Sequence, residues 1–110
     1  MKVLKVGQEI TIKEDFEVVC FEGKKKVKKG DKAFVTAGGN ANFVTGEARG
    51  KIQILSSAEI KGWDTENMAK IICSRLDVWF NLNSILQEHD MDISDVQEQL
   101  EDILLDILDF

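Results

Sequence analysis

The first 62 residues alternate between apolar and polar positions over short stretches that glycine-containing turns separate. Alternation with a period of two is typical of β-strands that bury one face. The pattern predicts strands over residues 3–6, 9–12, 16–21, 32–36, 43–45 and 51–55. Five or six strands in about 60 residues favour a small antiparallel β-barrel or half-barrel over residues 1–62.

One segment of this half has a more specific pattern. Residues 27–35, with the sequence VKKGDKAFV, resemble the strand entry of SH3-like barrels, in which a Gly-Asp pair precedes an alternating strand. The resemblance implies an SH3-like barrel for the strand-rich half. It implies a fold and not a function.

Residues 63–110 contain neither glycine nor proline, and their apolar positions recur with helical spacing. This pattern predicts a helix over about 65–88, with Asp64 or Thr65 as its N-cap. A second helix begins near Ser94, which forms a capping-box pattern with Gln97. We therefore predict an α+β fold in which an antiparallel two-helix hairpin, residues 63–110, packs on the barrel.

The predicted helix over 65–88 is apolar over an unusually wide arc of about 240°, where a surface helix shows little more than about 100°. Such a helix must be covered on more than one side. The barrel, the final helix and a second copy of the chain are the candidates to cover it. We expect a homodimer, with the core or dimer face carried by Ile71, Val78, Trp79 and Leu82.

The net charge of −6 is divided unequally between the two halves. Residues 1–62 hold twelve basic and eight acidic residues, whereas residues 63–110 hold two basic and twelve acidic ones. Half of those acids line one face of the final helix, with a leucine in their midst: Asp95, Glu98, Glu101, Asp102, Leu105, Asp106 and Asp109. These acids follow one another at about 4 Å of helix axis, close to the 3.4 Å spacing of phosphates along a DNA strand.

The acidic face has two interpretations. It imitates a nucleic-acid backbone and occupies a basic groove on a partner protein, or it is a solvated face that keeps the protein soluble. A helix-turn-helix reading of residues 84–104 is rejected, because an acidic recognition helix is repelled by DNA.

A run of lysines is the second charged feature of the sequence: Lys24, Lys25, Lys26, Lys28, Lys29 and Lys32. Such a run contacts phosphates, protects the edge of a sheet from pairing, or docks on the acidic helix of the same or a partner chain. No aromatic residue lies inside the run to stack on bases.

The sequence contains no recognisable catalytic set. His89 is the only histidine, and the two cysteines, Cys20 and Cys73, fall at positions predicted to be buried. A calcium-loop spacing that starts at Asp90 lacks the required glycine, because Asp95 occupies that position. We expect no enzyme activity, no metal and no cofactor.

The whole pattern resembles a group of small proteins. A short alternating barrel containing VKKGDKAFVT and TGEARGKI, followed by acidic helices, is similar to proteins carried by Firmicutes phages and mobile elements. Some of these are anti-CRISPR inhibitors of type II RNA-guided nucleases. The resemblance implies a non-enzymatic inhibitor that competes with guide RNA or target DNA for a basic nuclease.

The leading expectation is thus a cytoplasmic protein that binds a basic nucleic-acid enzyme through its acidic helix. No stretch is apolar over the ~20 residues that a membrane span needs, and the charged N-terminus is unlike a secretory signal. The alternatives are a small nucleic-acid-binding regulator that uses the lysine run, and a structural or assembly subunit.

Overall fold

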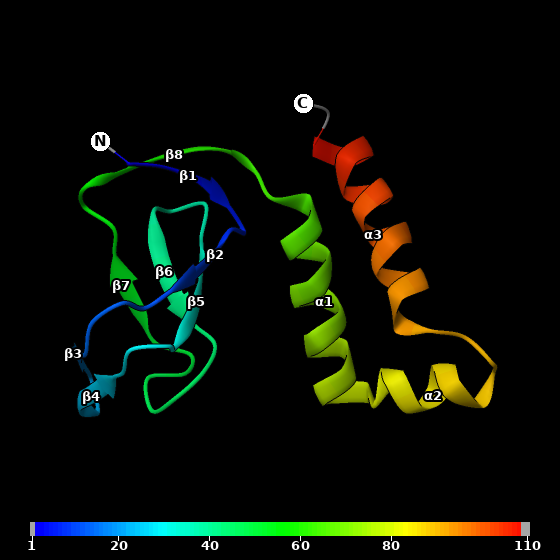
Figure 1. Ribbon diagram of the computed structural model, residues 1–110, viewed down its shortest axis with the longest axis horizontal. Helices are drawn as coiled ribbons and strands as arrows, with labels where there is room; N and C mark the ends of the chain where they lie inside the picture. Colours follow the sequence, from blue (N-terminus) through cyan, green and yellow to red (C-terminus); the bar gives the residue numbers. More distant parts are fainter. Residues whose placement is uncertain (1, 109–110) are drawn as a thin grey trace. The chain divides into compact units, whose positions relative to one another are not determined.

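The computed structural model describes residues 2–108 and has a mixed α+β fold (Figure 1). The chain divides into two compact units, one ending at Trp63 and the other beginning at Asp64. We call them the strand unit and the helical unit. The boundary lies one residue after the predicted one. The packing of the helices on the strands stays a prediction.

The strand unit contains eight short strands, two more than the largest number predicted. They are β1 (Lys2–Val6), β2 (Glu9–Thr11), β3 (Phe16–Cys20), β4 (Gly23–Val27), β5 (Lys32–Val35), β6 (Asn40–Phe43), β7 (Ile52–Ile54) and β8 (Ala58–Trp63). Two of them, β4 and β8, were not predicted. β4 lies in the lysine run, for which protection of a sheet edge was one of the interpretations.

The strands form three small sheets. One has four antiparallel strands in the order β2-β5-β6-β7, one is the antiparallel hairpin β3-β4, and the third is the pair β1-β8. The β1-β8 pair is parallel, with Lys2 opposite Ala58 and Leu4 opposite Ile60. Within residues 2–108 the strands do not close into a barrel, so a closed, wholly antiparallel barrel is wrong for this half.

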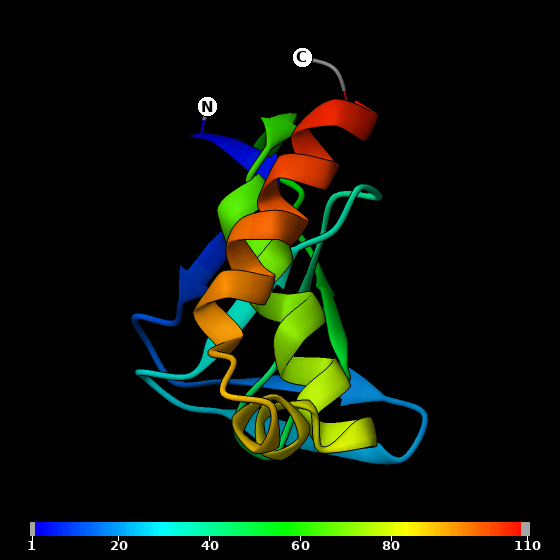
Figure 2. The ribbon, with the colours of Figure 1, turned by 90° about the vertical axis from the view of Figure 1, so that its right-hand side faces the viewer.

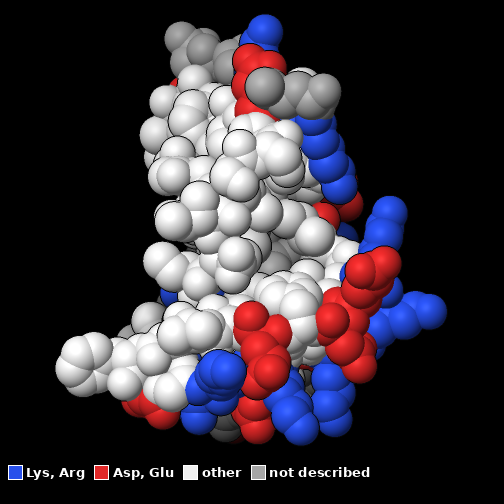
Figure 3. Space-filling view, turned by 90° about the vertical axis from the view of Figure 1, so that its left-hand side faces the viewer, with Lys and Arg blue, Asp and Glu red and all other residues white. Residues whose placement is uncertain are grey.

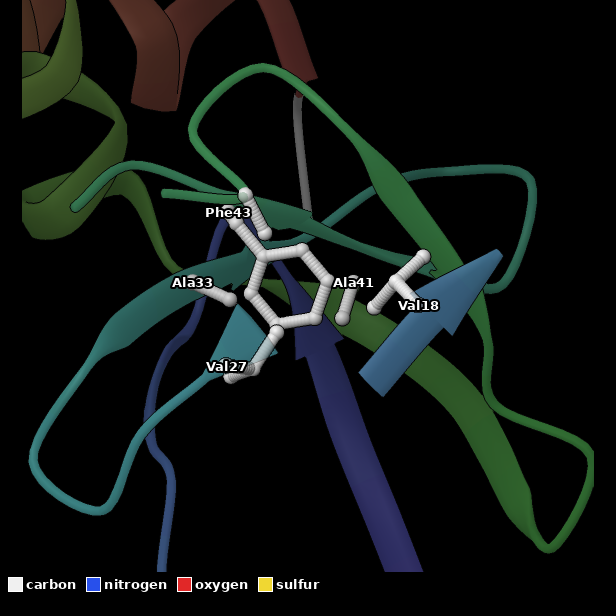
Figure 4. Close-up of a cluster of buried hydrophobic side chains, with 6 residues drawn as sticks. Val18, Val27, Ala33, Ala41 and Phe43 are labelled. Carbon is white, nitrogen blue, oxygen red and sulfur yellow. The ribbon is translucent and has the colours of Figure 1, made fainter. Parts of the chain in front are cut away.

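The hydrophobic core of the strand unit joins the hairpin to the four-stranded sheet. Val18 and Val27 come from the hairpin, and their side chains point towards Phe43 and Ala41 of the sheet (Figure 4). The Phe43 ring is 1% exposed, and its centroid lies 6.1 Å from that of Phe16. Apolar burial of this kind is the main force that stabilises a small domain.

The Gly-Asp pair of the SH3-like segment has a structural task. The Asp31 carboxylate accepts hydrogen bonds from the Lys28 amide at 2.9 Å and from the Thr45 hydroxyl at 3.3 Å. It also lies against Gly46, whose φ is +76° and where an added Cβ would come within 2.6 Å of an Asp31 oxygen. Asp31 therefore ties the turn before β5 to the loop after β6.

The helical unit contains α1 (Thr65–Phe80), α2 (Leu82–Glu88) and α3 (Ile93–Leu108). A single helix over 65–88 was wrong, because Asn81 adopts a left-handed conformation with φ 57° and separates α1 from α2. Hydrogen bonds to Asp77 hold the backbone on both sides of this break. The Asn81 amide donates to the Asp77 carbonyl at 2.9 Å, and the Asn83 amide donates to the Asp77 carboxylate at 2.8 Å.

The three helices form an elbow rather than a simple hairpin. α1 and α3 run side by side in opposite directions, and α2 crosses between their ends (Figure 1 and Figure 2). Both long helices begin at an aspartate. Asp64 accepts from the Asn67 amide at 3.0 Å, and Asp92 accepts from the Ser94 amide at 2.9 Å. The cap of α3 is therefore Asp92, not Ser94 as the sequence suggested.

Candidate protein-binding surfaces

The acidic side chains of α3 lie on the surface of the helical unit. Asp95, Glu98, Asp102 and Asp106 are exposed and Glu101 is half-buried, while Asp109 lies outside the described residues. The ion pairs of Lys51 with Glu22 and of Lys70 with Glu66 involve none of these acids. The face therefore presents a row of carboxylates to solvent.

The sequence positions of these acids make the row electrostatically unfavourable. Glu98 and Asp102 are four residues apart, as are Asp102 and Asp106, and like charges at this spacing cost about 0.2–0.5 kcal/mol per pair. Asp106 also lies in the last turn of α3, where the helix dipole disfavours an acid. The one ion pair that involves a lysine of α1, Lys70 with Glu66 at 3.7 Å, is within that helix.

Apolar side chains accompany the acids on α3. Leu105, which the sequence places among the acids, is 41% exposed. Ile103 and Ile107 lie on the apolar side that the helical spacing predicts for this helix, yet they are 50% and 71% exposed, and no described residue of α3 is fully buried. The helical spacing identified the apolar side of α3 but did not show that the unit leaves part of it uncovered.

The predicted core or dimer face of the first helix is divided by the break at Asn81. Ile71 and Leu82 are half-buried, whereas Val78 and Trp79 are exposed, Trp79 to 68%. The neighbouring large side chains are exposed as well, and we call the set the apolar elbow: Val78, Trp79, Phe80, Ile85 and Met91. A soluble domain seldom leaves so many large apolar residues uncovered in one segment unless they make a contact.

The lysine run lies on the hairpin and the turn after it. Lys24, Lys25 and Lys26 belong to β4, where Lys24 pairs with Val19 and Lys26 with Glu17 of β3. Lys28 and Lys29 follow in the turn, and Lys32 opens β5 with its ammonium 2.7 Å from the Thr11 hydroxyl. Lys24, Lys26, Lys28 and Lys29 are exposed, and Lys25 and Lys32 are half-buried.

Acidic residues lie close to these lysines. Glu47 accepts from the Lys26 amide at 2.6 Å, Asp15 accepts from the Lys29 amide at 2.7 Å, and Glu22 forms an ion pair with Lys51 at 3.2 Å. Figure 3 shows basic and acidic side chains intermingled on this part of the strand unit. The run is therefore not a uniform basic patch.

The tip of the hairpin carries an exposed aromatic residue that the sequence analysis did not select. Phe21 lies in the turn between β3 and β4 and is fully exposed, and Val19 beside it is 77% exposed. The sequence pattern predicted that Phe21 is the last residue of a strand over 16–21. The two-residue turn places it at the apex instead, close to Lys24.

The residues considered for metal or nucleophile chemistry are scattered. His89 is exposed at the end of α2, Cys20 is half-buried and donates its S–H to the Gly23 carbonyl at 3.0 Å, and Cys73 is fully buried. Burial raises the pKa of the Cys73 thiol, which disfavours the reactive thiolate. Within residues 2–108, no three His, Cys, Asp or Glu side chains are grouped so as to hold a metal ion.

Asp90 and Asp92, which the calcium-loop spacing includes, are exposed. The Asp92 carboxylate is engaged in the cap of α3, where hydrogen bonds from the Ser94 amide and hydroxyl lower its pKa. Asp95, at the position of the required glycine, lies in the first turn of that helix. Asp92 and Asp95 therefore serve the start of a helix.

The chain matches no protein-family model, no curated protein sequence and no solved structure. None of the helices within residues 2–108 has the length and apolar character that crossing a bilayer requires. The candidate surfaces thus rest on their own chemistry: the acidic face of α3, the apolar elbow and the lysine-bearing hairpin.

Proposed function

We propose that the protein is a non-enzymatic inhibitor that binds a basic nucleic-acid enzyme through the acidic face of α3. The observation that carries this proposal is the row of exposed carboxylates along α3, which contains no lysine or arginine. A helix selected for stability alone intersperses lysines among its acids. Repulsion between carboxylates along a whole helix face is expected where binding to a basic partner offsets it.

The exposed apolar residues on α3 support a protein as the partner. Leu105 lies among the acids, and Ile103 and Ile107 are also uncovered. Protein interfaces combine an apolar centre with a polar rim, and the centre supplies most of the affinity. The surrounding charge speeds association and makes it sensitive to salt.

The class of partner follows from the resemblance to anti-CRISPR proteins. It indicates a type II RNA-guided nuclease, whose positively charged channel holds a nucleic-acid duplex. A helix that presents carboxylates at nearly phosphate spacing competes there with guide RNA or target DNA. This proposal places the protein in the cytoplasm, where it acts without a cofactor.

The hairpin supports a second candidate function, which is binding of single-stranded nucleic acid. No aromatic residue lies inside the lysine run, but the exposed Phe21 lies at the tip of the hairpin whose second strand carries Lys24, Lys25 and Lys26. The intermingled acids weaken this alternative, since they reduce the attraction of the hairpin for phosphates.

A charge-reversal experiment tests the leading proposal. The variant Glu98→Lys/Asp102→Lys/Asp106→Lys is compared with the unaltered protein as a competitor of labelled guide RNA for a purified type II RNA-guided nuclease. The matched control, Glu9→Lys/Glu14→Lys/Glu59→Lys, changes the net charge equally but alters only exposed acids of the strand unit. We expect the α3 variant to lose competition and the control to keep it.

The outcome separates the two functions. Equal competition by both triple variants contradicts the role of the α3 face. Binding of labelled single-stranded RNA by the protein alone, lost on Phe21→Ser with Lys24→Glu, assigns the function to the hairpin instead.

A further inference from the structure

β7 is the outermost strand of the four-stranded sheet. Its inner side pairs with β6, with Asn42 opposite Ile52 and Asn40 opposite Ile54. No described strand pairs with its outer side. Such an edge offers a row of unpaired amide and carbonyl groups, which other chains can use for pairing.

The hydrogen bonds to β6 identify the groups that point outward. The Phe43 amide donates to the Lys51 carbonyl at 3.0 Å, and the Leu55 amide donates to the Gly39 carbonyl at 3.0 Å. In an antiparallel pair the bonded positions recur every second residue. Lys51, Gln53 and Leu55 therefore face β6, and the amides and carbonyls of Ile52 and Ile54 face outward.

The side chains of β7 do not protect this edge. Ile52 is 54% exposed and Ile54 is 71% exposed, and Gln53 between them is exposed on the opposite face. Residues 52–58 contain no charged residue, proline or glycine. By contrast, β4 carries three lysines, the protection that natural sheet edges commonly use. Figure 3 views the strand unit from the side on which β7 lies in Figure 1, and a broad uncharged area occupies its upper part.

We propose that β7 is a self-association edge, at which the β7 strand of a second copy pairs antiparallel around a twofold axis through Gln53. In this register Ile52 of one copy lies opposite Ile54 of the other. The outward amides and carbonyls of both residues then form four backbone hydrogen bonds. The strand is complementary to itself, as a twofold interface requires.

The side chains and charges of β7 are compatible with a second copy of the chain as the partner. The isoleucines of both copies lie on one face of the joined sheet and form an apolar ladder across the junction. Lys51 comes opposite Leu55 of the second copy, so the register sets no like charges against each other. Lys51 is also neutralised by Glu22 within its own chain, at 3.2 Å. A second copy is thus favoured over a charged peptide, for which residues 52–58 offer no counter-charge.

The pairing involves a short strand, so we expect a weak dimer whose population rises with protein concentration. This edge is separate from the helical face over which the sequence predicted a homodimer. The inference does not depend on the function proposed for α3.

Cysteine cross-linking tests the register. In this register Gln53 lies opposite Gln53 of the second copy at a non-hydrogen-bonded position. The Cα atoms of such a pair are about 4.5 Å apart, within the range that a disulfide spans. In a Cys20→Ser background we expect Gln53→Cys to form a covalent dimer on mild oxidation. The control Gln99→Cys places the same exposed residue type on α3, and we expect it to stay largely monomeric. Equal cross-linking of the two variants overturns the proposal.

Sedimentation equilibrium of the full chain tests the hydrogen bonds. Ile54→Pro removes an outward amide without touching the bonds to β6, whereas Ile54→Thr keeps that amide. We expect Ile54→Pro to abolish the dimer and Ile54→Thr to retain it, with unchanged circular dichroism in both. A chain that is monomeric at every concentration contradicts the proposal. So does a dimer that survives Ile54→Pro but is lost on Trp79→Ser, since that result places the contact on the apolar elbow.

Discussion

The strand unit and the helical unit differ in where they keep their apolar side chains. Among the described residues, eight apolar residues of the strand unit are fully buried, but only three of the helical unit: Ala69, Cys73 and Leu86. The helical unit nevertheless has eight large apolar residues exposed, against six in the strand unit. The strand unit thus has its own core, whereas the helical unit keeps much of its apolar surface available for contact.

The charges follow the same division. The strand unit intermingles lysines with acids, and several of those acids accept hydrogen bonds from backbone amides. The helical unit concentrates exposed carboxylates on α3, a helix without lysine or arginine. Exposed apolar residues beside charged ones match the apolar centre and polar rim of a protein interface. The comparison is the reason why we propose the helical unit as the binding half.

The largest expected effect is in the core of the strand unit. Phe43→Ala removes the largest fully buried side chain, and we expect a loss of about 3–5 kcal/mol in the free energy of unfolding. Urea denaturation followed by near-ultraviolet circular dichroism measures it. Trp79 is exposed, so we expect Trp79→Ala to lower the free energy of unfolding far less. An equal loss for the two variants contradicts the contrast between a buried core in the strand unit and exposed apolar residues in the helical unit.

The next effect lies at the break between α1 and α2. At φ 57° alanine has no polar side chain that can form a local hydrogen bond, as that of asparagine can. We therefore expect Asn81→Ala to lower the free energy of unfolding by about 1–2 kcal/mol. Asn81→Gly is the control and is expected to be close to neutral, since glycine adopts this conformation freely. Thermal unfolding of both variants decides the matter. A stabilising Asn81→Ala means that a continuous helix over residues 65–88 is accessible after all.

A smaller, pH-dependent effect is expected at the start of α3. Hydrogen bonds to the carboxylate of Asp92 lower its pKa in the folded protein below that in the unfolded chain. Its contribution to stability is therefore present above the unfolded pKa of about 3.9 and is lost as the pH falls through the folded pKa. Asp92→Asn keeps an acceptor but not the titration, so the variant is expected to show a shallower loss of helicity by circular dichroism below pH 4. An unchanged acid transition contradicts this assignment.

The smallest effect is a stabilisation. Asp102 is flanked by acids at i−4 and i+4, Glu98 and Asp106, and Asp102→Lys turns both repulsions into attractions. We expect the protein to gain up to about 1 kcal/mol in stability while binding to a basic partner weakens. Thermal unfolding and binding are measured on the same preparation. A variant that is less stable, or one that binds as well as before, contradicts the proposal that the repulsion on α3 is retained for binding.

The sequence predicted the mixed fold class and the exposure of most acids on α3, because alternation and helical spacing are local properties. It did not predict the open sheet arrangement, since the parallel β1-β8 pair joins segments more than 50 residues apart. It missed the break at Asn81 because a helix wheel continues through any polar residue. It also missed the exposure of Ile103, Ile107 and Phe21, because a periodic pattern shows which face is apolar but not whether anything covers it.

The most direct test of the central claim is the competition assay with the α3 triple variant. We expect Glu98→Lys/Asp102→Lys/Asp106→Lys to fold normally by circular dichroism and no longer to displace labelled guide RNA from a type II RNA-guided nuclease. We expect the equally charged control in the strand unit still to displace it. Displacement by the folded α3 variant at the unaltered protein's concentration contradicts the proposed role of the α3 face.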